Sequence, residues 1–181
     1  MDSMSRTIPS RVRPCGRGFS LVELVAVLTI AAIVAAVTVP AMSSTGAVRR
    51  SAAASQVARD LRVAREIGIT TGRNAWVAFD ASAESYTIRI EPFGNPGRAQ
   101  AVGWIDPATG REFRQTFGEA EWAGVAIASA SFGGGSVVGF DRLGGPLVHT
   151  GAAMLTTGQV VLEGGGTVLI EPGTGRVELG P

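Results

Sequence analysis

The chain has 181 residues, 45% of them hydrophobic, with 16 basic and 15 acidic side chains and a formal net charge of +1. This length allows one folded domain with a single core beside a long helix, not two domains. All the basic residues are arginines, and there is one cysteine and one histidine. P-loop and Schiff-base chemistries, which need lysine, are therefore excluded, and a conventional zinc site is disfavoured.

The N-terminal part of the chain combines a basic segment with an apolar run. Four arginines and Asp2 precede Phe19, and residues 19–42 contain only four polar side chains, at Ser20, Glu23, Thr29 and Thr38. About 20 apolar residues cross a bilayer as a helix, and a basic flank keeps its side of the segment in the cytoplasm. The pattern predicts a single-pass transmembrane helix over 19–42, with a cytoplasmic N-terminus and a C-terminal domain on the other side of the membrane.

Two other interpretations of this segment stay open. A secretory signal peptide would be cleaved near Ala41, but its apolar region usually has about 7–15 residues, and here an acidic residue, Glu23, lies in the first turn. An ordinary membrane anchor would need no such acidic residue, because an ionisable side chain in a spanning segment is costly and marks a functional site by default.

The residues around the start of the apolar run carry a resemblance to a known family. The stretch 18–24, Gly-Phe-Ser-Leu-Val-Glu-Leu after a basic leader, resembles the class III signal of type IV prepilins and type II secretion pseudopilins. The resemblance implies that residues 1–18 are a leader peptide. A prepilin peptidase would cut between Gly18 and Phe19 and methylate Phe19. It also implies a role in subunit assembly for Glu23.

The chemistry of Glu23 agrees with that resemblance. An α-amino group has a pKa near 8, so a new N-terminus at Phe19 would be positively charged. A charge inside lipid pairs or is neutralised. The resemblance implies that Glu23 meets the N-terminal amine of a neighbouring subunit as a filament grows. Alternatively, Glu23 reaches the lipid headgroups or is protonated.

Removal of the leader would change the composition of the protein. The only cysteine, Cys15, lies in the leader, so the processed chain could form no disulfide. Four arginines and Asp2 would also be lost, which leaves 12 arginines against 14 acidic residues and a net charge of about −2.

Beyond the apolar run, the pattern predicts an amphipathic continuation of the helix over 43–70. Pro40 should kink the helix, since it lacks an N–H and clashes with the preceding turn. An apolar seam then follows at helical spacing, formed by Ala54, Val57, Leu61, Ala64 and Gly68. Its small residues indicate a close approach of helix and sheet. Three arginines off the seam, at positions 59, 62 and 65, form a solvated face or contact lipid or neighbouring subunits.

From residue 71 to 181 the pattern changes to short strands. A hairpin is predicted at residues 75–79 and 86–90. Further strand candidates are 112–117, 125–128 and 137–140. The strand pattern is clearer at the C-terminus, over 159–163, 167–171 and 176–179. Residues 92–103 are a predicted loop. We therefore expect an α+β fold, in which a long N-terminal helix packs on an all-β domain of two small antiparallel sheets.

The C-terminal part carries a second resemblance. The sequence 140–146, Phe-Asp-Arg-Leu-Gly-Gly-Pro, followed by strand–glycine–strand patterns at 158–162 and 168–177, resembles the globular part of GspH/FimT-type minor pseudopilins. So does 61–66 at the end of the helix. The middle, roughly 92–135, matches no known pattern.

Catalysis is not indicated by the sequence. The single histidine, His149, has no nucleophile motif around it, and the carboxylates occur singly, at Asp80, Glu91, Asp106, Asp141 and Glu163. The glycine runs at 133–135 and 164–166 fit turns rather than a nucleotide fingerprint. We expect no enzyme activity, cofactor, metal site or small-molecule substrate.

The resemblance implies a minor pseudopilin subunit of a type II secretion filament in the inner membrane, with a periplasmic C-terminal domain. Its partners would be the prepilin peptidase and other pilin-like subunits. The alternative is a FimT-like minor pilin of a type IV pilus that binds DNA during uptake through arginines near its C-terminus. Phosphate contact needs clustered positive charge. Only Arg176 lies beyond Arg142, and it is flanked by Glu171 and Glu178, so the sequence disfavours nucleic acid as a partner.

Overall fold

The structure is a computed structural model that describes residues 20–180, without the side chains of residues 36–45. The chain divides into two compact units, residues 1–41 and residues 42–181. One helix, α1 (Leu21–Thr71), contributes to both units. The helix continues through Pro40 to Thr71, so the segment 43–70 is helical. The kink itself stays a prediction, because the side chain of Pro40 lies outside the described residues.

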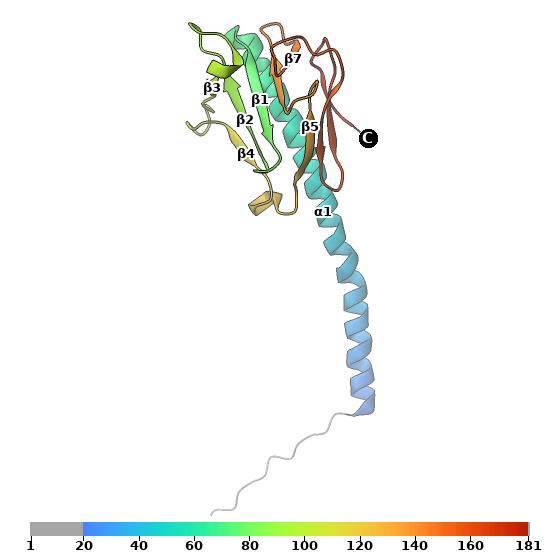
Figure 1. The fold of residues 1–181 in the computed structure, drawn as a ribbon. Helices are drawn as coiled ribbons and strands as arrows, with labels where there is room; N and C mark the ends of the chain where they lie inside the picture. Colours follow the sequence, from blue (N-terminus) through green and yellow to red (C-terminus); the bar gives the residue numbers. More distant parts are fainter. Residues whose placement is uncertain (1–19, 181) are drawn as a thin grey trace, which may run out of the picture. The chain divides into compact units, whose positions relative to one another are not determined.

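Two antiparallel sheets follow α1 in the second unit (Figure 1). The first sheet has the order β3-β2-β1-β6-β7, with β4 also paired to β2, and the second has the order β10-β9-β8-β5. The fold is thus the predicted α+β arrangement of a helix and two small sheets. The bounds of the strands are β1 (Ala75–Asp80), β2 (Ser85–Ile90), β3 (Val102–Gly103), β4 (Arg114–Thr116), β5 (Ile127–Ser131), β6 (Val137–Phe140), β7 (Pro146–Val148), β8 (Gly158–Leu162), β9 (Thr167–Ile170) and β10 (Val177–Leu179).

The β1–β2 hairpin shows how local chemistry fixes the register. Asp80 Oδ1 accepts hydrogen bonds from the backbone N–H groups of Ser82 and Ala83, both at 3.0 Å, which closes the turn. Val77 then lies opposite Ile88, so that the apolar residues of both strands share one face. That face is buried against α1 and the second sheet.

The apolar seam predicted on the helix lies in the core. Ala54, Val57, Leu61 and Ala64 are each 3% exposed or less and belong to one cluster with the inner faces of both sheets. Gly68 is buried as well, and a Cβ at this position would lie 2.9 Å from the Asp141 carbonyl oxygen. The small seam residues therefore allow the close helix–sheet approach that the sequence indicated.

The least predictable part of the domain is the middle of the chain. Residues predicted as a loop contain the short 3₁₀ helix Arg98–Gln100 and β3. The strand expected at 125–128 begins two residues later, as β5, and the strand-like stretch of sequence after Pro146 forms β7. Pro146 begins β7 at the edge of its sheet, where a missing N–H is tolerated.

Candidate functional site

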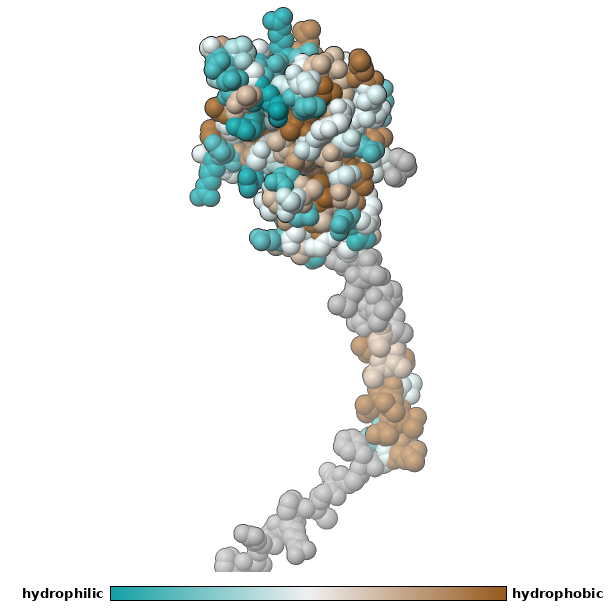
Figure 2. All heavy atoms as spheres, viewed as in Figure 1, coloured by the Kyte–Doolittle hydropathy of each residue, from teal (hydrophilic) through white to brown (hydrophobic). Residues whose placement is uncertain are grey.

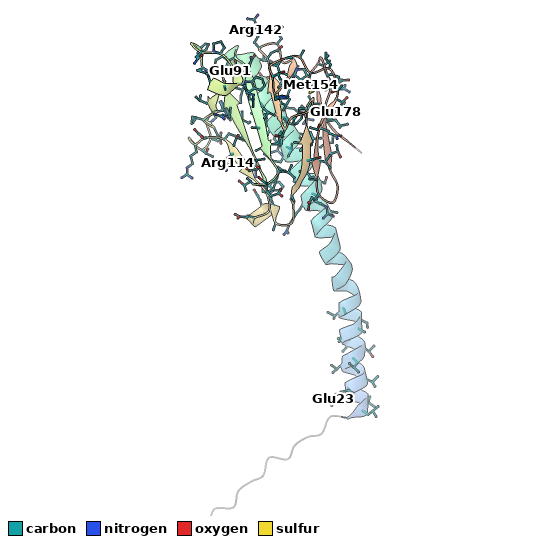
Figure 3. The ribbon with its side chains drawn as sticks, viewed as in Figure 1. Glu23, Glu91, Arg114, Arg142, Met154 and Glu178 are labelled. Carbon is teal, nitrogen blue, oxygen red and sulfur yellow. The ribbon has the colours of Figure 1, made fainter. Side chains whose placement is uncertain are left out.

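The first turn of α1 is stabilised by the polar residues that precede it. The Ser20 hydroxyl oxygen accepts a hydrogen bond from the Val22 N–H at 3.3 Å, as an N-cap residue does. Glu23 is an exposed residue of the first turn (Figure 3). A carboxylate here is favoured by the positive end of the helix dipole, whatever else it does. The local geometry therefore leaves the carboxylate of Glu23 at the solvent-facing start of the helix.

The helix segment that follows Glu23 has no polar face. Its large apolar side chains are all more than half exposed, from Val25 at 52% to Ile30 at 62%, and Figure 2 shows hydrophobic residues along this segment. The hydroxyl of Thr29 donates to the Val25 carbonyl oxygen at 2.7 Å and is thereby satisfied within the helix. A helix that is apolar on all sides is usually enclosed by lipid or by other protein.

The predicted processing site lies outside the described residues. Gly18 and Phe19, the two sides of the expected cleavage, are not described, so cleavage and methylation stay predictions. Among the residues that the structure describes, no helix has a run long and apolar enough to cross a membrane.

Two arginines of α1 connect the helix to the β domain. The Arg62 guanidinium donates to the Val177 carbonyl oxygen at 2.8 Å, and Arg65 Nε donates to the Gly144 carbonyl oxygen at 3.0 Å. Arg62 is exposed, as expected for a solvated face, and Arg65 is half-buried, but both also bind the helix to the β domain, at the start of β10 and at the turn between β6 and β7. Arg59 is exposed, as expected for a residue on the solvent side.

A buried carboxylate lies on the same helix. Asp60 Oδ2 accepts a 2.6 Å hydrogen bond from the Tyr86 hydroxyl, and both its oxygens lie 3.0 Å from Gln56 Nε2. Burial raises the pKa of Asp60 above its ordinary value, and the hydrogen bonds from Tyr86 and Gln56 and the charge of Arg59 offset only part of that shift. Burial also raises the pKa of Tyr86, with the Asp60 charge in support.

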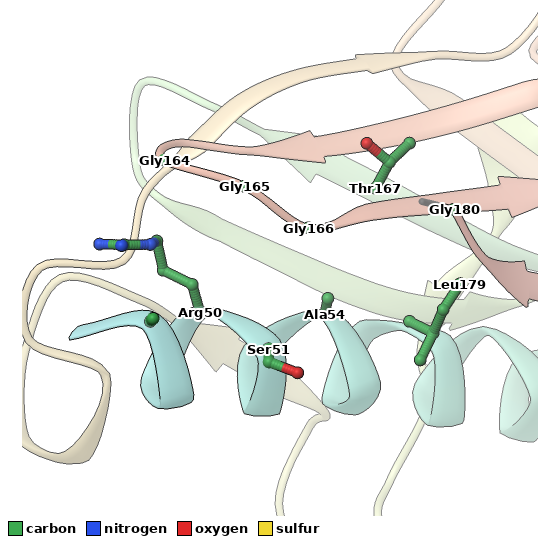
Figure 4. A pocket seen from close by; sticks show the side chains of 10 residues that line it. Arg50, Ser51, Ala54, Gly164, Gly165, Gly166, Thr167, Leu179 and Gly180 are labelled. Carbon is green, nitrogen blue, oxygen red and sulfur yellow. The ribbon is translucent and has the colours of Figure 1, made fainter. Parts of the chain in front are cut away.

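A hollow lies beside α1 near Arg50, where the buried part of the helix begins, and its lining contains no catalytic group of side chains. It has a volume of about 290 Å³ and is lined by the helix around Arg50 and by the Gly164–Thr167 turn (Figure 4). Its only polar side chains are those of Arg50, Ser51 and Thr167. Arg50 lies against the backbone of Gly164, where a Cβ would come within 3.0 Å of its Nε. The hollow is thus a packing feature of this turn.

The carboxylates singled out from the sequence serve the fold. Asp80, Asp106 and Asp141 each accept hydrogen bonds from residues of their own turns. Within the described part of the chain, no three His, Cys, Asp or Glu side chains gather as a metal site would require. His149 has its Nδ1 buried without a partner and packs against Gly135, away from any described carboxylate pair.

The comparisons with known proteins agree with both resemblances. Residues 13–39 match the family model described as the prokaryotic N-terminal methylation motif. Two structures of the minor pseudopilin EpsH from the Vibrio cholerae type II secretion system are similar in fold. Each has a TM-score of 0.52 and 13% identity over 72% of this chain, and the match covers 94% of one structure and 92% of the other. The chain has a pilin-like fold behind a prokaryotic N-terminal methylation motif.

Two other findings complete the comparison. The type IV minor pilin FimU of Pseudomonas aeruginosa also matches, at 13% identity over 72% of this chain and 91% of that chain, with a TM-score of 0.45. No curated protein matches in sequence. The expected resemblance to GspH/FimT-type minor pseudopilins is confirmed at the level of motif and fold. The two neighbours with a TM-score above 0.5 are both described as minor pseudopilins.

Sequence reasoning missed the polar contacts within this pilin-like domain. One of them left a signal: Asp60 follows Val57 by three residues and precedes Ala64 by four, so a carboxylate stands on the apolar seam itself. The partners of Arg62 and Arg65 left no such signal, because their acceptors are backbone carbonyls far along the chain.

Proposed function

We propose that this protein is a processed minor pilin-like subunit of a type II secretion filament. One observation carries the proposal: the methylation motif at 13–39 leads into a helix that is apolar on all sides and has an acidic residue in its first turn. A leader-bearing anchor alone would need neither the motif nor Glu23. The fold shared with EpsH supports the minor pseudopilin class.

In this proposal the residues at the start of the helix assemble the subunit. Prepilin peptidase cuts after Gly18, and Phe19 becomes the methylated N-terminus. Its amine remains positively charged, and Glu23 of one subunit pairs with the amine of its neighbour, because neither charge is stable alone in lipid. The apolar side chains of 21–35 then pack against neighbouring helices, and the β domain lies in the periplasm, where it contacts other subunits.

Replacement of Glu23 tests the assembly role. Glu23→Ala and Glu23→Gln should insert and be processed like the wild type, but should be recovered in filament fractions at about one tenth of the wild-type level or less. Thr29→Ala changes a polar residue of the same segment that is satisfied by Val25, and serves as the matched control. Wild-type incorporation of both Glu23 variants would refute the role.

The DNA-uptake alternative has less support. Arg176, the C-terminal arginine that could contact phosphate, forms ion pairs with Glu178 and with Glu171, the latter at 3.6 Å. Its charge is thus neutralised locally, and a processed chain with a net charge of about −2 should bind duplex DNA poorly at physiological salt. A salt-dependent gel shift of duplex DNA by the purified protein would reverse this preference.

A further inference from the structure

A second hollow lies where three segments of the β domain meet. It has a volume of about 450 Å³ and is formed by the connection between α1 and β1, the loop after β2 and the turn between β6 and β7. Glu91 and Arg142, which both line it, lie at the same end of the domain in Figure 3. We call it the Phe93 hollow; its lining residues used below are Arg73, Glu91, Phe93, Asp141, Arg142 and Leu143.

Large apolar side chains stand at the rim of the Phe93 hollow. Phe93 is 80% exposed and Leu143 is 81% exposed. The ring of Phe93 is held from one side, since the Arg73 guanidinium carbon lies 4.3 Å from its centroid. Pro92 and Pro96 flank the loop and limit its backbone freedom. The aromatic ring is therefore presented to solvent in a restricted position, which lowers the entropy cost of binding.

The two carboxylates of the Phe93 hollow are already committed to hydrogen bonds. Glu91 is only 4% exposed, and its carboxylate accepts from Trp76 Nε1 at 2.8 Å and from Asn74 Nδ2 at 3.2 Å. Asp141 Oδ1 accepts from the N–H groups of Leu143 and Gly145, each at 2.8 Å. All four donors are neutral groups, so these bonds fix the two carboxylates in place and leave their negative charges intact.

The two arginines, in contrast, have no carboxylate partner. Arg73 Nη1 donates to the Glu91 carbonyl oxygen at 3.2 Å, while its Nε is buried without an acceptor. Arg142 is exposed, and in the described part of the chain only Arg176 takes part in ion pairs. The hollow thus offers two guanidinium groups outside any ion pair beside apolar surface, while hydrogen bonds within the fold hold its two carboxylates in place.

We propose that the Phe93 hollow is a docking site for a segment of a partner protein that presents a carboxylate next to a large apolar side chain. The carboxylate would meet Arg73 and Arg142, and the apolar side chain would fill the space between Phe93 and Leu143. Aromatic residues and arginines are enriched at the energetic centres of protein interfaces. Two cations are too few for a polyanion such as nucleic acid, whose binding grows with the number of phosphates contacted.

The proposal does not depend on the filament to which the subunit belongs. It concerns only side chains of the β domain, whereas processing and assembly concern Gly18, Phe19 and Glu23. If the proposed docking site is refuted, the proposed processing and assembly are not affected, and the reverse also holds.

The test uses the full chain in nanodiscs of zwitterionic phosphatidylcholine. Two fluorescent peptides are titrated: one in which glutamate alternates with leucine, and one in which lysine replaces glutamate. The acidic peptide should bind, more weakly as salt is raised, and the basic peptide should not. Phe93→Ala and Arg142→Glu should each weaken binding of the acidic peptide by about tenfold. Arg142→Glu should also gain affinity for the basic peptide.

Matched controls lie elsewhere on the same domain. Arg111→Glu reverses an exposed arginine and Leu155→Ala truncates an exposed leucine, both outside the Phe93 hollow, and neither should change binding. Tryptophan fluorescence verifies that each variant is folded. Equal loss in Arg111→Glu and Arg142→Glu, or binding of the basic peptide by the wild type, would overturn the proposal. The proposal would also be overturned if duplex DNA displaced the acidic peptide better than unlabelled acidic peptide does, or if the protein self-associated and Arg142→Glu abolished that self-association.

Discussion

Replacement of Gly68 by alanine tests the close approach of α1 to the first sheet. In a helix, alanine is more stable than glycine by about 0.5–1 kcal/mol, so the exchange should stabilise the protein if the site has room. The structure gives no room. The new Cβ would lie 2.9 Å from the carbonyl oxygen of Asp141 and 3.1 Å from that of Phe140, and both are backbone atoms that cannot rotate away.

The magnitude follows from the two opposing effects. Overpacking of a buried contact costs about 1–3 kcal/mol, which exceeds the gain in helix propensity. Gly68→Ala should therefore lower the free energy of unfolding by about 1–2 kcal/mol and the Tm by about 2–8 °C, given about 2–4 °C per kcal/mol for a chain of this size. Gly46→Ala makes the same exchange in the same helix, where the nearest atom is the flexible Arg50 Nη1 at 3.4 Å. It should stabilise by up to about 1 kcal/mol.

The assay is urea and thermal unfolding of the full chain in mild detergent, followed by tryptophan fluorescence. All three tryptophans, Trp76, Trp104 and Trp122, follow α1 in the sequence, so the signal reports on the β domain alone. Opposite signs for Gly68→Ala and Gly46→Ala are expected. A rise in Tm for Gly68→Ala would show that the helix does not approach the sheet as closely as the structure places it.

Two further predictions concern the polar contacts of α1. Because burial raises the pKa of Asp60, its protonated form stabilises the native state at low pH, and this stabilisation is lost as pH rises through the raised pKa. Asp60→Asn should remove this loss of stability from a profile of urea midpoint against pH between pH 4 and 8. The prediction would be contradicted if the profile of Asp60→Asn ran parallel to that of Glu66→Gln, a control at an exposed site. Arg62→Ala should lower the free energy of unfolding by about 1 kcal/mol, because the hydrogen bond to the Val177 carbonyl oxygen is lost from a site that water partly reaches. Arg59→Ala, at an exposed position, should change the free energy of unfolding by less than about 0.5 kcal/mol. Equal losses in the same unfolding assay would mean that the Arg62 bond contributes nothing.

The predictable parts of the fold are those with a strong period. The helical seam from Ala54 to Gly68, the β1–β2 hairpin and the C-terminal strands all follow from apolar spacing and turn residues, because burial of one face fixes both the element and its register. The middle could not be predicted in this way. There β3 and β4 have two and three residues, too short to show a period, and they are held by pairing to β2.

The candidate assembly site can be proposed from sequence because its signal is local: a glycine, an aromatic residue, a glutamate and an apolar run must coincide within one short segment. The Phe93 hollow cannot be proposed in this way, because it joins side chains from three segments that only the fold brings together. Glu91 stood out as a lone carboxylate, yet its partner Trp76 is identified only by the pairing of β1 with β2.

The mass of the protein extracted intact from its native membrane tests the central claim most directly. Processing after Gly18 predicts a chain that begins at Phe19 and carries one additional methyl group on its N-terminus, with the arginine-bearing leader absent. A chain that retains residues 1–18, or one that begins near Met42, would contradict the claim, since neither presents a charged amine one helical turn from Glu23.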